Sequence, residues 1–107
     1  MTTFGPYPAV VYGVHDGDTL SVDIDLGFGL HARSFRCRIY GINAPELKTP
    51  EGKDALAFLL TLLPLGTTVR VVSHGWDKYG GRFDGEVWLY GRSVGDQMVA
   101  AGHAVAI

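Results

Sequence analysis

One cysteine, no long apolar run and almost no net charge set the first limits on this chain. Cys37 has no partner for an internal disulfide. No stretch of about 18 apolar residues is present, so the sequence offers no membrane-spanning helix. The formal net charge is −2, whereas domains that hold nucleic acid by charge alone are usually basic. Any contact with nucleic acid must therefore be local, made by a few arginines and a bound cation.

Targeting signals and repeats are also missing. The first six residues lack a basic stretch followed by an apolar core, so no signal peptide is recognised. The mature form of a secreted protein would look the same, so a secreted and a cytoplasmic location both stay open. Low-complexity tracts and linkers are absent. We therefore expect residues 1–107 to form one domain.

The glycines and prolines indicate a chain of short strands and turns. There are 15 glycines and 5 prolines, which interrupt alternating apolar patterns typical of half-buried strands. Strands are expected at residues 10–14, 20–26, 33–40, 68–73 and 85–90. Helices are expected at residues 52–63 and 94–101, and residues 41–50 are expected to be an irregular loop. Ser93 is the predicted N-cap of the second helix.

The order of these elements predicts the fold class. Three strands, a helix, two strands and a short C-terminal helix fit an α+β protein built on a five-stranded Greek-key barrel of the OB type. The first helix should face the barrel with a leucine stripe at helical spacing, formed by Leu56, Leu59, Leu60 and Leu63.

Oxygen-bearing side chains gather at the first turn and in the loop after the third strand. Asp16 and Asp18 flank a glycine at the turn. Calcium and magnesium take carboxylates, amide oxygens and backbone carbonyls as ligands. Asn43, the carbonyl of Ala44 and Glu46 are further candidates. The alternative is that the aspartates are ordinary turn residues.

Arginines and one glutamate flank the same region. Arg38 and Arg82 could each bind a phosphate through two guanidinium nitrogens, or simply pair with an acid. Glu46 could take a proton from a water whose pKa a cation has lowered, or be an ordinary surface residue. Lys78 and Tyr79 could hold a terminal phosphate and stack on a base, or belong to an exposed turn.

Three motifs together resemble the staphylococcal-nuclease-type (thermonuclease) domain. They are Asp16-Gly17-Asp18-Thr19, Arg38 placed eight residues before Glu46, and Asp77-Lys78-Tyr79-Gly80 leading to Arg82. The first motif is weak alone, but all three in this order and spacing are a strong signal. The resemblance runs from about residue 10 to residue 104, including a stretch similar to the second helix of that family.

This resemblance implies an OB barrel that cleaves DNA or RNA with calcium and leaves 3′-phosphate ends. Asp18 matches a calcium-ligating aspartate, and Asp16 matches an acid close to the ion. Ala44 matches a residue that offers its backbone carbonyl to the ion.

The resemblance also implies roles for the remaining residues. Arg38 and Arg82 match the arginines that bind the scissile phosphate and stabilise its transition state. Glu46 matches the glutamate usually proposed as general base. Lys78 and Tyr79 match residues that contact the terminal phosphate of the nucleotide.

The chain departs from the family pattern in three places. Asn43 stands where the family often has a second metal-ligating aspartate, which removes one negative charge and leaves the preferred divalent cation open. Gly81 is an apparent insertion before Arg82. The chain also stops soon after the second helix, where the family commonly adds aromatics and a third helix; a second copy of the chain is one candidate to cover that face. The alternative to a nuclease is an OB module that binds nucleic acid or a protein without cleavage.

Overall fold

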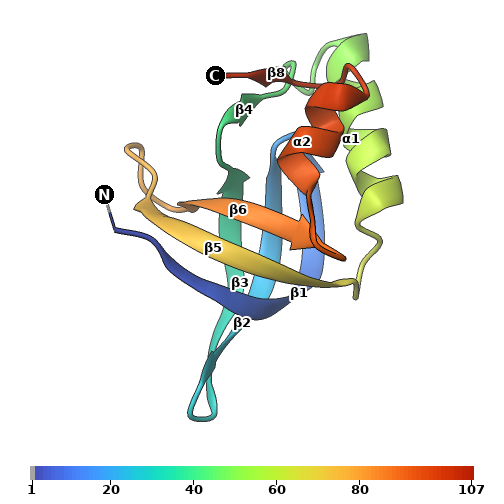
Figure 1. The fold of residues 1–107 in the computed structure, drawn as a ribbon. Helices are drawn as coiled ribbons and strands as arrows, with labels where there is room; N and C mark the ends of the chain where they lie inside the picture. The colour runs from blue at the N-terminus through green and yellow to red at the C-terminus, as the bar shows by residue number, and fades with distance from the viewer. Residues whose placement is uncertain (1) are drawn as a thin grey trace.

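The computed structural model describes residues 2–107. Eight strands and two helices make up these residues (Figure 1). In chain order they are β1 (Phe4–Asp16), β2 (Thr19–Gly27), β3 (Leu30–Ile39), β4 (Ile42–Asn43), α1 (Pro50–Leu62), β5 (Thr68–Trp76), β6 (Phe83–Leu89), β7 (Arg92–Ser93), α2 (Val94–Ala100) and β8 (Val105–Ala106).

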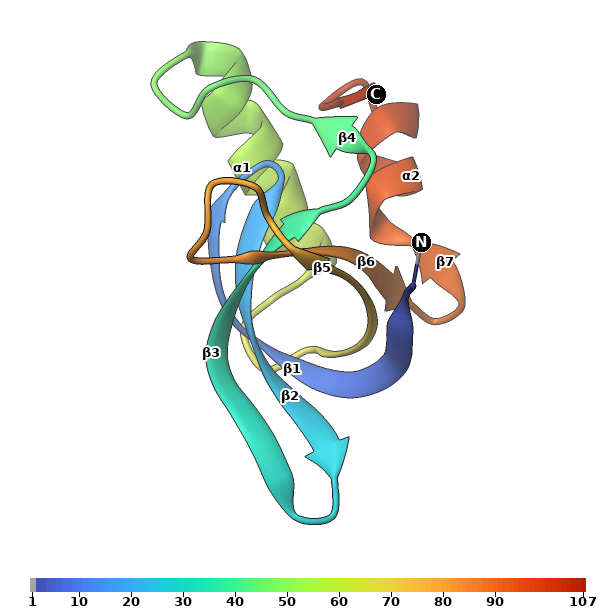
Figure 2. The same ribbon diagram turned by 90° about the vertical axis from the view of Figure 1, so that its left-hand side faces the viewer.

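Five of these strands close into a barrel (Figure 2). The hydrogen-bonded order is β3-β2-β1-β5-β6, with antiparallel neighbours. A parallel pairing between β3 and β6 closes the ring, and it places Arg38 opposite Asp84. The predicted five-stranded OB barrel, with one helix after its third strand and a short helix near the end, is confirmed.

The apolar residues of the strands form the barrel core. In β2, Leu20, Val22 and Ile24 are buried as predicted, while Leu26 is exposed. The reason is that the β2–β3 hairpin extends past the barrel, at the bottom of Figure 1, so its outer residues have nothing to pack against. Cys37 is fully buried among the core residues.

Helix α1 begins where its sequence provides a cap. The hydroxyl of Thr49 accepts a hydrogen bond from the backbone N–H of Gly52 at 3.0 Å, and Pro50 occupies the first helical position. The buried face runs through Gly52, Ala55 and Leu59.

The predicted leucine stripe of α1 is partly wrong. Leu59 and Leu63 are fully buried, but Leu60 is exposed. The reason is geometric, since the buried face is centred on the row of residues four apart, and Leu60 lies about 100° around the helix from Leu59.

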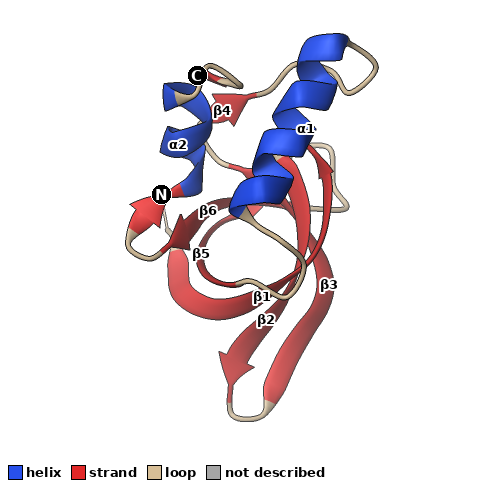
Figure 3. Cartoon of the chain, turned by 90° about the vertical axis from the view of Figure 1, so that its right-hand side faces the viewer, coloured by secondary structure: helices blue, strands red, loops and turns tan. Residues whose placement is uncertain are grey.

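Helix α2 lies beside α1 over the same end of the barrel (Figure 3). The hydroxyl of Ser93 caps it as predicted, accepting from the backbone N–H of Asp96 at 3.2 Å. Val94 and Met98 are fully buried. Neither helix in residues 2–107 is long and apolar enough to cross a membrane.

The segment expected to be wholly irregular contains a short strand. Residues of β4 pair antiparallel with β8, Ile42 with Ala106 and Asn43 with Val105. The backbone N–H of Ile107 also donates to the carbonyl of Gly41 at 2.9 Å. The partner lies about sixty residues away in the chain, so local sequence patterns carried no sign of this pairing. It ties the loop that carries Asn43 to the end of the chain.

Candidate active site

The turn between β1 and β2 is packed tightly against the loop after β4 and against α1. Gly17 is buried, and a Cβ atom at this position would lie 2.7 Å from the Cβ atoms of both Ala44 and Ala55. Only glycine allows this approach. The backbone N–H of Asp18 donates to Oδ1 of Asp16 at 3.0 Å, which closes the turn. The turn is thereby held where its second aspartate reaches Ala44.

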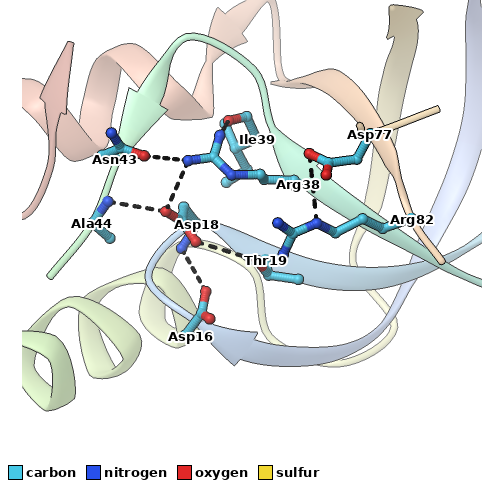
Figure 4. Close-up of polar contacts among 9 residues, drawn as sticks. All are labelled: Asp16, Asp18, Thr19, Arg38, Ile39, Asn43, Ala44, Asp77 and Arg82. Carbon is cyan, nitrogen blue, oxygen red and sulfur yellow. Dashed lines mark hydrogen bonds and ion pairs between the residues drawn. The ribbon is translucent and has the colours of Figure 1, made fainter. Parts of the chain in front are cut away.

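Asp18 is the residue that connects the turn to the loop. Its Oδ2 accepts a hydrogen bond from the backbone N–H of Ala44 at 3.0 Å and lies 3.7 Å from Nη2 of Arg38 (Figure 4). Burial raises the pKa of the Asp18 carboxyl, and the neighbouring Asp16 adds to the rise. The Ala44 N–H and the Arg38 charge oppose it. Burial of this turn therefore disfavours the charged form of Asp18 more than the Ala44 N–H and Arg38 favour it.

Arg38 bridges Asp18 and Asn43. It is the next-to-last residue of β3 and lies opposite Thr19 of β2. Its Nη2 donates to Oδ1 of Asn43, so the guanidinium lies between that amide and the carboxylate of Asp18 (Figure 4). The backbone N–H of Ile39 also donates to the carbonyl of Asp18 at 2.7 Å. The β2–β3 register thus determines where the guanidinium lies.

The oxygens at this turn match the chemistry of a hard divalent cation. Carboxylate, amide and backbone carbonyl oxygens are the ligands that calcium and magnesium prefer. Residues 2–107 hold no group of three His, Cys, Asp or Glu side chains placed for a metal ion. A cation beside Asp18 would therefore need the amide of Asn43 and the carbonyl of Ala44 in addition to carboxylates.

A second aspartate–arginine pair closes the loop between β5 and β6. The backbone N–H of Asp77 donates to the carbonyl of Arg82 at 2.9 Å, and Nε of Arg82 lies 3.6 Å from Oδ2 of Asp77. Oδ1 of Asp77 accepts from the backbone N–H of Tyr79 at 2.9 Å. That hydrogen bond is the main cause of a lowered pKa of the Asp77 carboxyl, to which Arg82 contributes. Gly81 adopts the left-handed conformation, φ +74°, within this closed loop.

Asp84 is an acid beside both arginines that the sequence analysis did not select. One of its carboxylate oxygens is buried, with no hydrogen-bond partner among the described residues. Burial raises its pKa, and the nearby Asp77 carboxyl raises it further, while Arg38 and Arg82 oppose the rise. No local pattern marks this residue, because its position next to Arg38 comes from the parallel β3–β6 pairing.

One open cavity of about 700 Å³ collects most of the predicted residues. The predicted residues on its wall are Arg38, Asn43, Lys78, Tyr79 and Arg82. The wall also contains Tyr40, Trp76, Asp77, Asp84, Gly41 and Ile107. Arg38 and Arg82, which are 44 positions apart in the sequence, therefore face the same space.

Comparison with known proteins identifies the family of this chain. Residues 36–107 match the family described as staphylococcal nuclease homologue. The chain belongs to this family. A probable staphylococcal-like nuclease of Oryza sativa subsp. japonica is 37% identical over 73 residues, which are 68% of this chain and 19% of that protein. A staphylococcal-like nuclease of Arabidopsis thaliana is 37% identical over 73 residues, 68% of this chain and 22% of its own length.

This staphylococcal nuclease homologue spans about a fifth of the length of the curated relatives that it matches. The family match begins at residue 36, after Asp16 and Asp18. These two aspartates are connected to the matched region by the contacts of Asp18 with Ala44 and Arg38. The resemblance proposed from the three sequence motifs is confirmed at the level of the family.

Glu46 lies apart from the other predicted residues of this homologue. Its side chain is 73% exposed and pairs with Lys48 at 3.3 Å. Its backbone carbonyl accepts from the hydroxyl of Thr49 at 2.7 Å, and Gly52 packs closely beneath it. The backbone of Glu46 is thus held at the start of α1, while its carboxylate points into solvent and does not line the arginine cavity.

Two further aromatic residues on the cavity wall were not selected from the sequence. Tyr40 and Trp76 both line the cavity. A signal for Tyr40 was present, because alternate residues of a strand share a face and Tyr40 follows Arg38 by two positions. No such signal exists for Trp76, which lies at the end of β5.

Proposed function

We propose that this chain is a calcium-dependent nuclease, a metal-dependent phosphodiesterase that hydrolyses DNA or RNA and leaves 3′-phosphate ends. The observation that carries the proposal is the convergence of Arg38 and Arg82 on one cavity. Two guanidinium groups on one open cavity suit a phosphodiester, because each can form paired hydrogen bonds to phosphate oxygens. The names of the relatives support the same reaction class.

The two arginines would bind the phosphate and stabilise the charge that develops as phosphorus becomes five-coordinate. Phosphoryl transfer depends mostly on positioning and electrostatic stabilisation. Each arginine now lies 3.6 to 3.7 Å from an aspartate. At such distances the pairs are loose enough for an incoming phosphate to take over part of the guanidinium contacts.

The cation would be held by Asp18, Asn43 and the carbonyl of Ala44, with Asp16 nearby. A bound divalent cation at this place would supply positive charge to the phosphate and lower the pKa of a bound water. Asp18 would hold its ion with help from the Ala44 N–H, which already orients its carboxylate. The amide of Asn43 is neutral, so magnesium or manganese remain alternatives to calcium.

Glu46 would act as the general base, and Lys78 and Tyr79 would contact the substrate. The exposed carboxylate of Glu46 has to leave Lys48 and turn toward an attacking water. Nζ of Lys78 lies 5.2 Å from the ring centre of Tyr79, which places a cation and an aromatic face together for a terminal phosphate and its sugar or base. A Glu46→Gln variant that cleaves at the wild-type rate would exclude the base role.

The first test is cleavage of single-stranded DNA by the 107-residue protein, with calcium and then with excess chelator. Arg38→Ala should lower the rate by about a hundred- to a thousandfold, as the loss of other single stabilising donors does. Arg33→Ala is the matched control, because Arg33 is an exposed arginine of the same strand that does not line the cavity. Equal rates for the wild type and Arg38→Ala would contradict the proposal.

A second candidate function is a module that binds nucleic acid without cleaving it. The observation in its favour is the position of Glu46, whose carboxylate pairs with Lys48 rather than with the residues of the cavity. A folded protein that binds single-stranded DNA but does not cleave it with calcium, magnesium or manganese would favour this function.

A further inference from the structure

Tyr40 lies beside the arginine cavity with much of its ring uncovered. It follows β3 directly, two residues after Arg38, and both side chains line the same cavity. Its preceding neighbour, Ile39, is fully buried in the core, whereas Tyr40 is 46% exposed. A large aromatic ring on the wall of an open polar cavity has a face available for a ligand.

The other face of the Tyr40 ring is covered by His74. The two rings are stacked in parallel, with centroids 3.8 Å apart and an angle of 8° between their planes. Tyr40 lines the cavity and His74 does not, so the ring meets the cavity with its side turned away from His74. Tyr40 thus presents a free aromatic face that is supported from behind.

A hydrogen-bonded chain holds His74 in place. Nε2 of His74 lies 2.6 Å from Oε2 of Glu86, and Nε1 of Trp88 donates to Oε1 of the same carboxylate at 3.1 Å. His74 belongs to β5, and Glu86 and Trp88 belong to the neighbouring strand β6. The barrel sheet therefore fixes the histidine, and the histidine fixes the plane of the tyrosine. A ring held this way loses little conformational entropy when a ligand stacks on it.

Tyr40 differs from the other exposed aromatics of the cavity. Trp76 and Tyr79 are 66% and 78% exposed. Trp76 leans on Phe35 at a tilt of 43°, and Tyr79 contacts the flexible side chain of Lys78. Of the three, only Tyr40 lies face to face on a second ring. It is therefore the best prepared of them to receive a flat ligand.

We infer that the free face of Tyr40 is a subsite for one nucleobase of a single-stranded nucleic acid, with His74 as the residue that positions it. The inference rests on the proposed function, since it assumes that Arg38 and Arg82 hold the phosphate of the same strand. Bases stack on aromatic side chains regardless of their identity, because every base has a π-face. In a duplex the bases are stacked inside the helix, so the subsite selects unpaired strands.

The test compares binding of two oligonucleotides of equal length, one with bases and one made only of abasic sugar–phosphate units. Binding is measured by fluorescence anisotropy with chelator present, so that hydrolysis does not interfere. Wild type should prefer the oligonucleotide with bases. Tyr40→Ala should reduce that preference by between about 5-fold and 150-fold, the range for loss of one stacked base. Its affinity for the abasic chain should stay unchanged.

Two variants serve as controls. Tyr40→Phe keeps the ring and should keep the preference. Tyr12→Ala removes an exposed tyrosine of β1 that does not line the cavity, and it should bind as wild type does. If Tyr40→Ala weakens the binding of both oligonucleotides equally, or weakens the binding of neither, the subsite is overturned. A wild-type protein without preference for bases would overturn it as well.

The positioning role of His74 has its own readout. His74→Ala should lower the preference for bases, and the double variant with Tyr40→Ala should lose no more than Tyr40→Ala alone. An unchanged preference in His74→Ala would overturn this role. Cleavage is measured in parallel to separate the two proposals. Preference that depends on Tyr40 without cleavage contradicts the nuclease, while cleavage without that preference contradicts the subsite.

Discussion

Two aspartate–arginine pairs in this protein have nearly the same separation, but the pKa values of their aspartates are shifted in opposite directions. Asp18 and Arg38 are 3.7 Å apart, and Asp77 and Arg82 are 3.6 Å apart. Yet the pKa of the Asp18 carboxyl is raised, whereas that of Asp77 is lowered. The distance between ion-pair partners therefore does not determine how well the carboxylate is stabilised.

The surroundings of the two carboxylates explain the difference. Burial and the acid at position 16 act on Asp18, and together they outweigh the Ala44 N–H and the arginine. Asp77 instead accepts a backbone N–H from Tyr79, which favours its charged form. Burial disfavours the charged form of Asp18, and the proposed cation would favour that form. Asp77 serves to close a loop that presents Arg82. A cation beside Asp18 therefore stays our proposal, whereas the contacts of Asp77 give the second pair a structural role.

The largest expected effect is the loss of cleavage when the arginine of either pair is removed. Arg82→Ala should lower cleavage by about a hundred- to a thousandfold, as expected for Arg38→Ala. If both guanidinium groups contact one phosphate, the double variant should lose less than the product of the single losses. Single-turnover rates of the four proteins measure this. If the cleavage rate of the double variant falls by the full product of the two single losses, the arginines act on separate groups.

A smaller effect tests how tightly each region is packed. Gly17→Ala should destabilise the protein by about 1–3 kcal/mol, because its Cβ meets two alanine side chains at 2.7 Å. Gly81→Ala has open space and should cost about 1 kcal/mol, from its left-handed backbone alone. Urea denaturation measures both.

The same two glycine variants should respond differently to calcium. Gly17→Ala pushes the turn of Asp18 away from Ala44, so calcium should no longer raise its midpoint of thermal unfolding. Gly81→Ala leaves that turn untouched and should keep the wild-type response. A calcium-induced shift of equal size in both variants would show that the ion does not bind at the first turn.

A further negative charge beside Asp18 should strengthen the response of this turn to calcium. Asn43→Asp places a third carboxylate near Asp18 and Asp16, which should tighten calcium binding by about tenfold, or about 1.4 kcal/mol. Without calcium the same variant should be less stable than wild type, since the carboxylates repel one another. The calcium dependence of the unfolding midpoint tests both effects, with Asn43→Ala as the control that removes the ligand. Lower stability at every calcium concentration, with no larger shift, would contradict the assignment.

The smallest expected effect is on the midpoint of thermal unfolding, which Asp18→Asn and Asp77→Asn should change in opposite directions. The folded protein holds the Asp18 proton more tightly than the unfolded chain does, so stability is lost as the pH rises from 3.8 through the raised pKa of Asp18. Asp77 ionises more easily in the folded protein, so its charge adds stability above 3.8, and this is lost as the pH falls through its lowered pKa.

At pH 7 and with chelator present, Asp18→Asn should therefore raise the unfolding midpoint slightly, and Asp77→Asn should lower it. The difference between the two variants should shrink as the pH falls through the raised pKa of Asp18 to 3.8, and shrink further as it falls from 3.8 through the lowered pKa of Asp77. Thermal unfolding monitored between pH 3 and pH 7 measures it. If both variants shift the unfolding midpoint in the same direction at pH 7, the two aspartates do not differ in how their charge affects stability.

Much of the barrel could be predicted because its signals are local. The apolar positions Leu20, Val22 and Ile24 of β2 and the cap of Ser93 depend on neighbouring residues, and they are as predicted. The cap of Thr49 is also local, but the helix was expected to begin only at residue 52. The exposure of Leu60 could not be predicted, because the spacing of leucines does not say which edge of a helical stripe meets the barrel. The β4–β8 pairing was missed for the related reason that its partners are distant in the chain.

The candidate site also has residues that the sequence predicted and a neighbour that only the closed barrel supplies. Spacing around Arg38 and Asn43 was enough to propose a phosphate site with oxygen ligands nearby, and these two side chains do contact each other. Nothing in the spacing placed Asp84 beside Arg38, because that neighbour comes from the closure of the barrel. The general-base role of Glu46 stays a prediction, because its carboxylate lies in solvent.

The sequence by itself determined the five barrel strands, the two helices, the turn at Gly17 and the residue types offered to a phosphate and a cation. Only the tertiary structure decided which of these residues share a cavity, that His74 supports the ring of Tyr40, and that two similar ion pairs have opposite pKa shifts. The physical reason is that propensity and capping act between chain neighbours. Burial, stacking and carboxyl pKa depend instead on groups that only the closed barrel brings together.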